Sequence, residues 1–200
     1  YAKRIGEFTA LLNFAGFEGG LWSNPELINH ITGNDDIEGY VLYNSGKILI
    51  LTDKRFLAEA ESVQKYLPVQ IYTNNVFTYL GQSLTSKGNF AADFGSITHA
   101  HFNKLTESMP DVTILDSSEL INSFLGSADE KTLEDFNSAA EITEHLFRHC
   151  KDSFEKNRWL TEKQLKFELL QELSETRATG FSFDPIIAVD TNSAKPHHAP

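Results

Sequence analysis

The chain has very little cysteine, since Cys150 is the only one among its 200 residues. A single thiol cannot close a disulfide within the chain, and it cannot supply a zinc cluster built from several thiolates. Scaffolds held together by disulfides are therefore excluded. Because disulfides persist mainly in oxidising compartments, this composition favours a reducing one, and we expect a cytoplasmic protein.

Long apolar runs are also missing. No stretch approaches the roughly 20 apolar residues that a membrane-spanning helix needs, and the charged N-terminus is not followed by the apolar segment of a signal peptide. We therefore expect no membrane contact. The chain begins without methionine and stops inside a motif described below, which favours a fragment of a longer protein.

Positive charge is scarce as well. The chain has 17 Lys and Arg against 28 Asp and Glu, which gives a formal net charge of −11. Proteins that bind nucleic acid present clusters of basic residues to the phosphates, and no basic stretch interleaved with aromatic residues occurs here. We expect no nucleic-acid partner. The negative charge favours solubility or a basic partner.

Helix and strand patterns alternate through the first 126 residues. Ile5, Phe8 and Leu12 repeat at helical spacing, and Ser45 and Gly46 stand between two apolar runs as in a hairpin turn. The predicted helices cover 5–15, 25–33, 56–66, 76–84 and 97–107, and the predicted strands cover 19–22, 39–43, 47–51, 69–72, 89–94 and 112–115. This alternation predicts the α/β class, with a mixed β-sheet flanked by helices.

The pattern changes after Gly126, where we place a domain boundary between residues 1–126 and 127–200. A long helix is predicted over 129–156, with apolar side chains on two stripes. Two stripes predict burial on more than one side, as in a helix wedged between two domains. The buried side chains are expected to include Leu133, Phe136, Ile142, Leu146 and Phe147.

A further helix is predicted over 162–175, because Thr161 and Gln164 form a capping-box pattern at its start. After it, an apolar strand is predicted over 186–189, followed by a polar turn over 190–193. His197 and His198 come next, between two prolines. Since proline fixes φ, we expect this histidine pair to be held in place. Imidazole titrates near neutrality and can donate or accept a proton.

This C-terminal stretch resembles a motif of the peptidase family that contains aminopeptidase P, prolidase and creatinase. The family pattern is close to Ser-Phe-x-x-Ile-Val-Ala-x-Gly-x-Asn-Ser-Ala-x-Pro-His-x-x-Pro. The matching positions are Ser182, Phe183, Ile186, Ala188, Asn192, Ser193, Ala194, Pro196, His197 and Pro200. Residues 24–33 and 49–56 are similar, in the same order, to two motifs of the family's N-terminal domain. The likeness spans nearly the whole chain.

The resemblance implies a fold and an activity. Residues 1–126 would form a creatinase-like N-terminal domain, and 127–200 the first, incomplete part of an α+β pita-bread domain. The complete protein would be a metal-dependent Xaa-Pro peptidase, of the aminopeptidase P or prolidase type, that hydrolyses the peptide bond before proline. It would act on proline-containing peptides as a homodimer.

The same resemblance implies the roles of the site residues. His197 would transfer a proton or stabilise the reaction intermediate, and His198 would line the substrate pocket. Two divalent metals, usually manganese but also cobalt or zinc, would be held by residues after Pro200. We therefore expect no metal ligand in this chain, and no peptidase activity from this chain alone.

Two alternatives stay open. The large subunit of the FACT histone chaperone has the same two-domain architecture without the metal ligands, and it binds peptides and proteins. The acidic charge and the altered domain junction over 125–132 are compatible with such a non-catalytic module. Creatinase-type C–N hydrolysis of a small guanidino compound is the other alternative, and it needs no metal.

The remaining histidines have less specific patterns. His145 and His149 are four residues apart on the predicted long helix, a spacing that can bind zinc. Neither has an evident third ligand, so a solvated helix face is the favoured interpretation. His99 and His101 could project from one side of a strand, but a helix is favoured there too.

Other residues fit structural roles better than chemical ones. Asp53 and Arg55 are expected to form an ion pair or a cap at a helix start. Trp22 or Trp159 could touch a ligand, although packing in a core or at a domain contact is favoured. Ser193 lacks the Gly-x-Ser-x-Gly elbow of a nucleophile, so a hydrogen bond within the turn explains it better.

Overall fold

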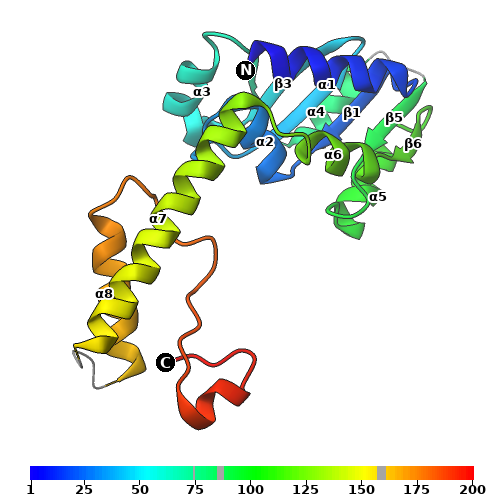
Figure 1. Cartoon of the computed structure of the whole chain (residues 1–200). Helices are drawn as coiled ribbons and strands as arrows, with labels where there is room; N and C mark the ends of the chain where they lie inside the picture. Colours follow the sequence, from blue (N-terminus) through cyan, green and yellow to red (C-terminus); the bar gives the residue numbers. More distant parts are fainter. Residues whose placement is uncertain (74, 85–87, 157–160) are drawn as a thin grey trace. The chain divides into compact units, whose positions relative to one another are not determined.

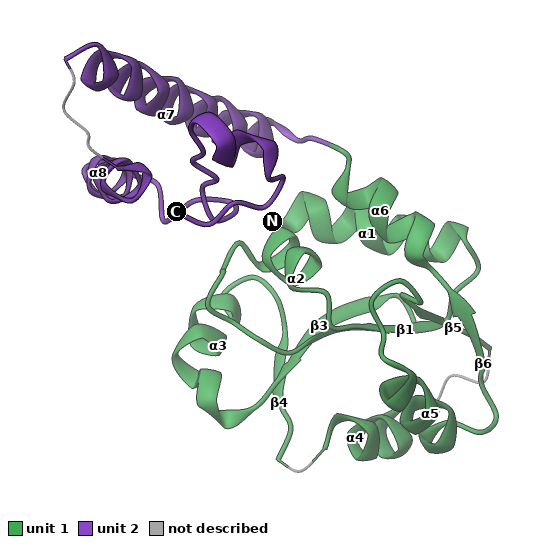
Figure 2. Ribbon diagram, turned by 90° about the horizontal axis from the view of Figure 1, so that it is seen from below, with its two compact units in different colours: residues 1–127 green, residues 128–200 purple. Residues whose placement is uncertain are grey.

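The structure is a computed structural model that describes residues 1–73, 75–84, 88–156 and 161–200. The chain forms two compact units, unit 1 (Tyr1–Ser127) and unit 2 (Ala128–Pro200), shown in different colours in Figure 2. Figure 1 shows the order of their helices and strands along the chain. Among the described residues, no helix is both long enough and apolar enough to cross a membrane.

Unit 1 is built on a six-stranded sheet with the strand order β4-β3-β2-β1-β5-β6. The strands are β1 (Gly19–Trp22), β2 (Tyr40–Asn44), β3 (Lys47–Thr52), β4 (Val69–Ile71), β5 (Asn89–Ala92) and β6 (Thr113–Asp116). β2 pairs antiparallel with β1 and β3, whereas the other neighbours pair in parallel. The predicted mixed sheet of the α/β class is confirmed.

Helices cover both faces of this sheet (Figure 2). They are α1 (Ala2–Phe14), α2 (Pro25–Thr32), the 3₁₀ helix η1 (Lys54–Phe56), α3 (Leu57–Val63), α4 (Val76–Ser83), α5 (His99–Ser108) and α6 (Ser118–Leu125). α1, α2 and α6 lie over one face, and α4 and α5 lie over the other. Successive side chains of a strand point to opposite faces of the sheet, and on this sheet each face carries a buried apolar cluster. The sequence patterns did not predict α6.

Local sequence signals explain where several elements begin and end. The Asn24 side chain accepts a hydrogen bond from the Leu27 N–H at 3.0 Å, which caps α2, and Gly33 ends that helix with a φ of 63°. Ser45 and Gly46 both have positive φ at the β2–β3 turn, 48° and 84°. Two positive φ angles suit the twist of a two-residue hairpin, so the predicted hairpin is confirmed.

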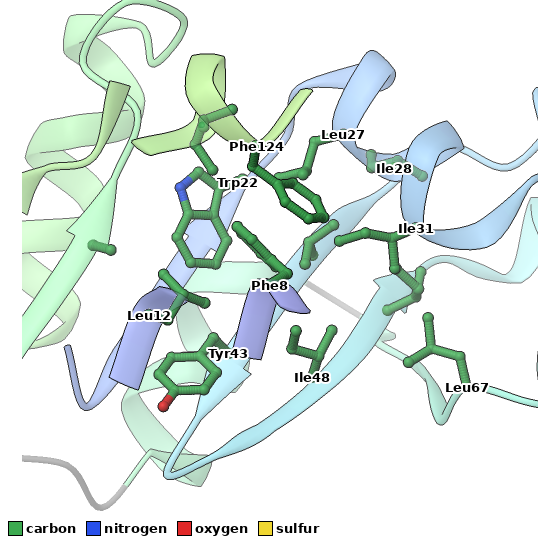
Figure 3. Packing of buried hydrophobic residues seen from close by; sticks show 14 of the residues in the cluster. Phe8, Leu12, Trp22, Leu27, Ile28, Ile31, Tyr43, Ile48, Leu67 and Phe124 are labelled. Atoms are coloured by element: carbon green, nitrogen blue, oxygen red, sulfur yellow. The ribbon is translucent and has the colours of Figure 1, made fainter. Parts of the chain in front are cut away.

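Aromatic side chains fill the core on the α1 side of the sheet (Figure 3). Phe8 stacks on Phe124, with ring centroids 4.7 Å apart, and meets Trp22 edge-on at 5.3 Å. Trp22 is only 2% exposed, and its indole N–H donates to the Ser117 hydroxyl at 2.9 Å. Trp22 is therefore a core residue, as the favoured interpretation had it, whereas Trp159 lies outside the described residues.

Unit 2 contains α7 (Glu130–Glu155), α8 (Glu162–Ser174) and a 3₁₀ helix, η2 (Asp190–Ala194). α7 and α8 lie side by side (Figure 1). Thr161 accepts a hydrogen bond from the Gln164 N–H at 3.2 Å, so the predicted cap of α8 is confirmed. The two helices enclose a small core in which Leu146, Leu169 and Leu173 are buried.

The predicted burial of both apolar stripes of α7 is wrong. Leu146 is 8% exposed and Ile142 is partly buried, but Leu133, Phe136 and Phe147 are 52%, 69% and 72% exposed. The reason is geometric, because a single neighbouring helix covers only one stripe of a helix surface.

The predicted strand over 186–189 is also wrong, since this segment forms no strand. An isolated extended segment needs a neighbouring strand to accept its backbone hydrogen bonds. No strand occurs among the described residues of unit 2. Ile187 instead packs against the small core of α7 and α8.

Candidate functional site

Residues 189–200 form a compact turn, here called the histidine turn. Successive local hydrogen bonds shape it, from Asn192 N–H to Val189 C=O at 3.0 Å and from Lys195 N–H to Asn192 C=O at 2.9 Å. Asp190 has a φ of 50°, in the left-handed region that suits glycine. This angle explains why the family motif has glycine there, and Asp is among the residues that tolerate it.

One carboxylate receives hydrogen bonds from three positions of the histidine turn. Glu162, in the first turn of α8, accepts from the Val189 N–H at 2.6 Å and from the Asn192 side-chain amide at 3.1 Å. His198 Nε2 lies 2.8 Å from the second Glu162 oxygen. The Glu162 and His198 side chains are only 17% and 13% exposed. Glu162 thus joins the turn to the start of a helix.

The charge state of Glu162 follows from these contacts. The Val189 N–H, and after it the His198 ring, hold the pKa of the Glu162 carboxyl below its ordinary value. Negative charge is also favourable at a helix N-terminus, where the free backbone N–H groups lie. Glu162 is therefore a carboxylate near neutral pH.

The two predicted site histidines have different surroundings. His198 contacts Glu162 and is half-buried, whereas His197 is exposed. His197 makes no hydrogen bond or ion pair to any other part of the chain that the structure describes. Ser193 donates to the Ala188 carbonyl at 3.2 Å, as expected of a turn residue.

His145 and His149 face carboxylates on α8. His145 Nε2 lies 2.7 Å from Glu172, and His149 Nε2 lies 2.9 Å from Glu168. The His145 side chain is 55% exposed, whereas the His149 side chain is 21% exposed and lines a hollow of about 430 Å³. Across the described ranges, no group of three or more His, Cys, Asp or Glu side chains is arranged to hold a metal ion.

A second hollow, of about 470 Å³, lies in unit 1 beside Asp53 and Arg55. Asp53 caps η1 by accepting from the Arg55 N–H at 2.9 Å, and it pairs with the Arg55 guanidinium at 2.7 Å. The expected cap and ion pair are confirmed. The Arg55 side chain, by its hydrogen bonds, lowers the pKa of Asp53, and burial raises the pKa values of Tyr40 and Tyr72 in the same hollow.

His99 and His101 lie on α5, so the favoured helical interpretation is confirmed. His99 Nε2 is 3.2 Å from the Asn103 amide nitrogen on the same helix, and the His101 ring packs beside Phe77. The first contact lies within α5, and the second joins α5 to α4.

The decisive comparison concerns unit 1. Residues 4–124 match the family of the creatinase/prolidase N-terminal domain. The chain belongs to this family. The creatinase/prolidase match covers almost all of unit 1, and it confirms the family resemblance that the sequence motifs indicated. The histidine turn lies outside the matched range.

Solved structures of Xaa-Pro peptidases have a similar fold. The Xaa-Pro dipeptidase from Bacillus anthracis matches with a TM-score of 0.84 and 19% identity, over 98% of this chain and 56% of that one. The prolidase from Thermococcus sibiricus matches with a TM-score of 0.82 and 22% identity, over 100% of this chain and 57% of that one. The X-Pro aminopeptidase from Thermotoga maritima MSB8 matches with a TM-score of 0.77 and 18% identity, over 99% of this chain and 55% of that one. At these identities the likeness concerns the fold.

The creatinase/prolidase chain described here spans little more than half the length of these structures. No curated protein sequence matches it significantly. The likeness in fold extends over unit 2 as well as unit 1, because it covers at least 98% of the chain in all three cases.

Sequence reasoning missed Glu162 as a site residue. The capping pattern at Thr161 located the start of α8, and therefore placed Glu162 in its first turn. Its partners come 27, 30 and 36 residues later. No periodicity links positions so far apart, so only the folded chain shows that they meet.

Proposed function

We propose that the chain is the N-terminal part of a metal-dependent Xaa-Pro peptidase, which hydrolyses the peptide bond before proline. Its membership of the creatinase/prolidase family supports the proposal, together with the likeness in fold between nearly the whole chain and little more than half the length of solved Xaa-Pro peptidases. The observation that carries it is the histidine turn, because its sequence fits the family motif and its geometry leaves one of two imidazoles exposed.

In this proposal, His197 transfers a proton or stabilises the reaction intermediate, since its ring is open to a bound peptide. His198 forms part of the pocket wall. A proline-containing peptide is the substrate, and a homodimer is the assembled form.

Two divalent cations, with manganese as the first choice and cobalt or zinc as others, would activate water and polarise the scissile carbonyl. The described residues of this chain do not form a fitting ligand group. The proposal therefore assigns the ligands to the part of the protein after Pro200. Purified chain 1–200, given an Xaa-Pro dipeptide and manganese, is expected to show no turnover.

The test compares the two histidines in the full-length protein. His197→Ala is expected to lower kcat by about 10²–10⁴-fold, the usual range for a positioned acid–base group, without changing the metal content. His198→Gln is the matched control, because its amide can still donate to Glu162, and we expect a much smaller loss. Equal losses in both variants, or loss of metal from the His197 variant, would contradict the assigned roles.

A further inference from the structure

The Glu162 side chain holds the histidine turn against α8. We propose that Glu162 is a positioning residue, which fixes the turn on α8 and binds His198 so that His197 is the imidazole left for the reaction. This inference rests on the proposed function, because the turn has a catalytic meaning only in a peptidase of this family. The structural part of the inference can be tested in the chain as it stands.

The long-range hydrogen bonds of the histidine turn go to Glu162. Apart from those to Glu162, the hydrogen bonds made by described residues of the histidine turn join positions at most five apart. Such local bonds give the turn its shape but do not attach it to anything. The bonds to Glu162 span 27 to 36 residues. Removing this carboxylate would therefore detach a turn that keeps its local form.

The charge of the Glu162 carboxylate suits it to this role. An ionised carboxylate only accepts hydrogen bonds, and its two oxygens offer about four acceptor sites. The donors at Glu162 are a backbone N–H, an amide and an imidazole, so a charged oxygen faces each of them. Hydrogen bonds to a charged acceptor are roughly twice as strong as neutral ones. Glutamine at this position would keep the shape but would lose the charge.

The contact with Glu162 also distinguishes the two imidazoles of the turn. Because Glu162 accepts, the His198 Nε2 must carry a proton, and this contact fixes the tautomer and the orientation of the ring. His198 is thereby committed to a structural contact. His197, the next residue along the same turn, is exposed. The two histidines therefore differ in role because His198 contacts Glu162, and not because their side chains differ in chemistry.

The structural test uses chain 1–200 and NMR. In Glu162→Ala, the Val189 amide is expected to exchange with solvent roughly 10- to 100-fold faster, as for the loss of a bond to a charged acceptor. The hydrogen-bonded Nε2–H signal of His198 should disappear. Glu172→Gln is the matched control, since Glu172 lies on the same helix but contacts His145. It should leave both signals unchanged.

Two results would overturn the structural part. One is unchanged Val189 exchange and His198 signal in Glu162→Ala, which would mean that other contacts hold the turn. The other is loss of protection at Leu169 and Leu173 together with the turn, which would make Glu162 a general stabiliser of unit 2. Retained protection of the α8 interior with loss of the turn supports the proposal.

The catalytic part needs the full-length enzyme and a double-mutant cycle. Glu162→Gln is expected to lower kcat about 10- to 100-fold, while KM stays within about twofold, because a displaced His197 impairs the reaction more than binding. In a His197→Ala background, Glu162→Gln should cause no further loss. Additive losses, or full kcat in Glu162→Gln, would overturn the positioning role. Absence of any peptidase activity in the wild type would instead contradict the proposed function, and the NMR result would still stand.

Discussion

Trp22 shows how one polar atom is accommodated in an apolar core. Its indole ring packs against Phe8, while its N–H reaches the Ser117 hydroxyl, and both residues are buried. A buried donor without a partner costs free energy, because water can no longer satisfy it. Ser117 therefore not only precedes α6 but also supplies the acceptor that the buried indole N–H of Trp22 needs.

We expect Ser117→Ala to lower the free energy of unfolding by about 1–3 kcal/mol, because it leaves the buried indole N–H without an acceptor. Urea unfolding followed by tryptophan fluorescence would measure this. Ser123→Ala is the control, as Ser123 is an exposed serine on α6. A loss no larger than that of the control would show that the indole finds another acceptor.

Each helix of unit 2 depends on the other for its buried surface. α7 is 26 residues long, yet only the stripe around Leu146 is covered by α8. Carboxylates of α8 also meet the two histidines of α7, at 2.7 and 2.9 Å. The position of a side chain around the axis of α7, and not its hydrophobicity, thus decides how much it contributes to the stability of unit 2.

Adjacent residues of α7 test this point. Leu146→Ala is expected to cost about 2–5 kcal/mol, as for a buried leucine, whereas Phe147→Ala should change stability by no more than about 0.5 kcal/mol, as for a surface site. Thermal and urea unfolding of chain 1–200 would give both values. Equal destabilisation by the two changes would mean that the second stripe is covered in solution.

The attachment of the histidine turn to α8 should depend on pH. The folded-state pKa of Glu162 is lowered, so its contribution is present above the unfolded value of about 4.3 and is lost as pH falls through the lower folded pKa. We expect the protection factor of the Val189 amide to hold down to about pH 4 and to fall below it. In Glu162→Gln this acid step should be absent. A step of equal size in that variant would assign it to a group other than Glu162.

For the molecule as a whole, the two units differ in the size of their cores. Unit 1 buries apolar side chains on both faces of its sheet, whereas in unit 2 the buried cluster consists of Leu146, Leu169 and Leu173. A domain needs a sufficient buried apolar core to offset the conformational entropy that folding removes. Unit 1 satisfies this condition from its own residues.

We therefore expect residues 1–127 to fold alone with a cooperative urea transition. Circular dichroism and dispersion of NMR signals would report on this fragment. A non-cooperative transition of fragment 1–127, with exposed apolar surface that binds a hydrophobic dye, would contradict the independence of unit 1.

Much of unit 1 could be predicted because its signals are local. Asn24 with Pro25 starts α2, Gly33 ends it, and Ser45 with Gly46 turns the hairpin, since each depends on backbone preferences within a few residues. The segment over 186–189 has an equally apolar pattern but forms no strand. Pairing is a property of two segments, and the described part of unit 2 contains no partner strand.

The sequence by itself determined the α/β class, the capped starts of α2 and α8, the family and the histidine motif. Only the tertiary structure decided which stripe of α7 is buried, and which of two adjacent histidines is bound and which is exposed. Covalent neighbours share the same local preferences, so the sequence offers no means to distinguish His197 from His198 by environment. The distinction arises because folding brings Glu162 to the turn, and a contact between residues 36 positions apart exists only in the folded chain.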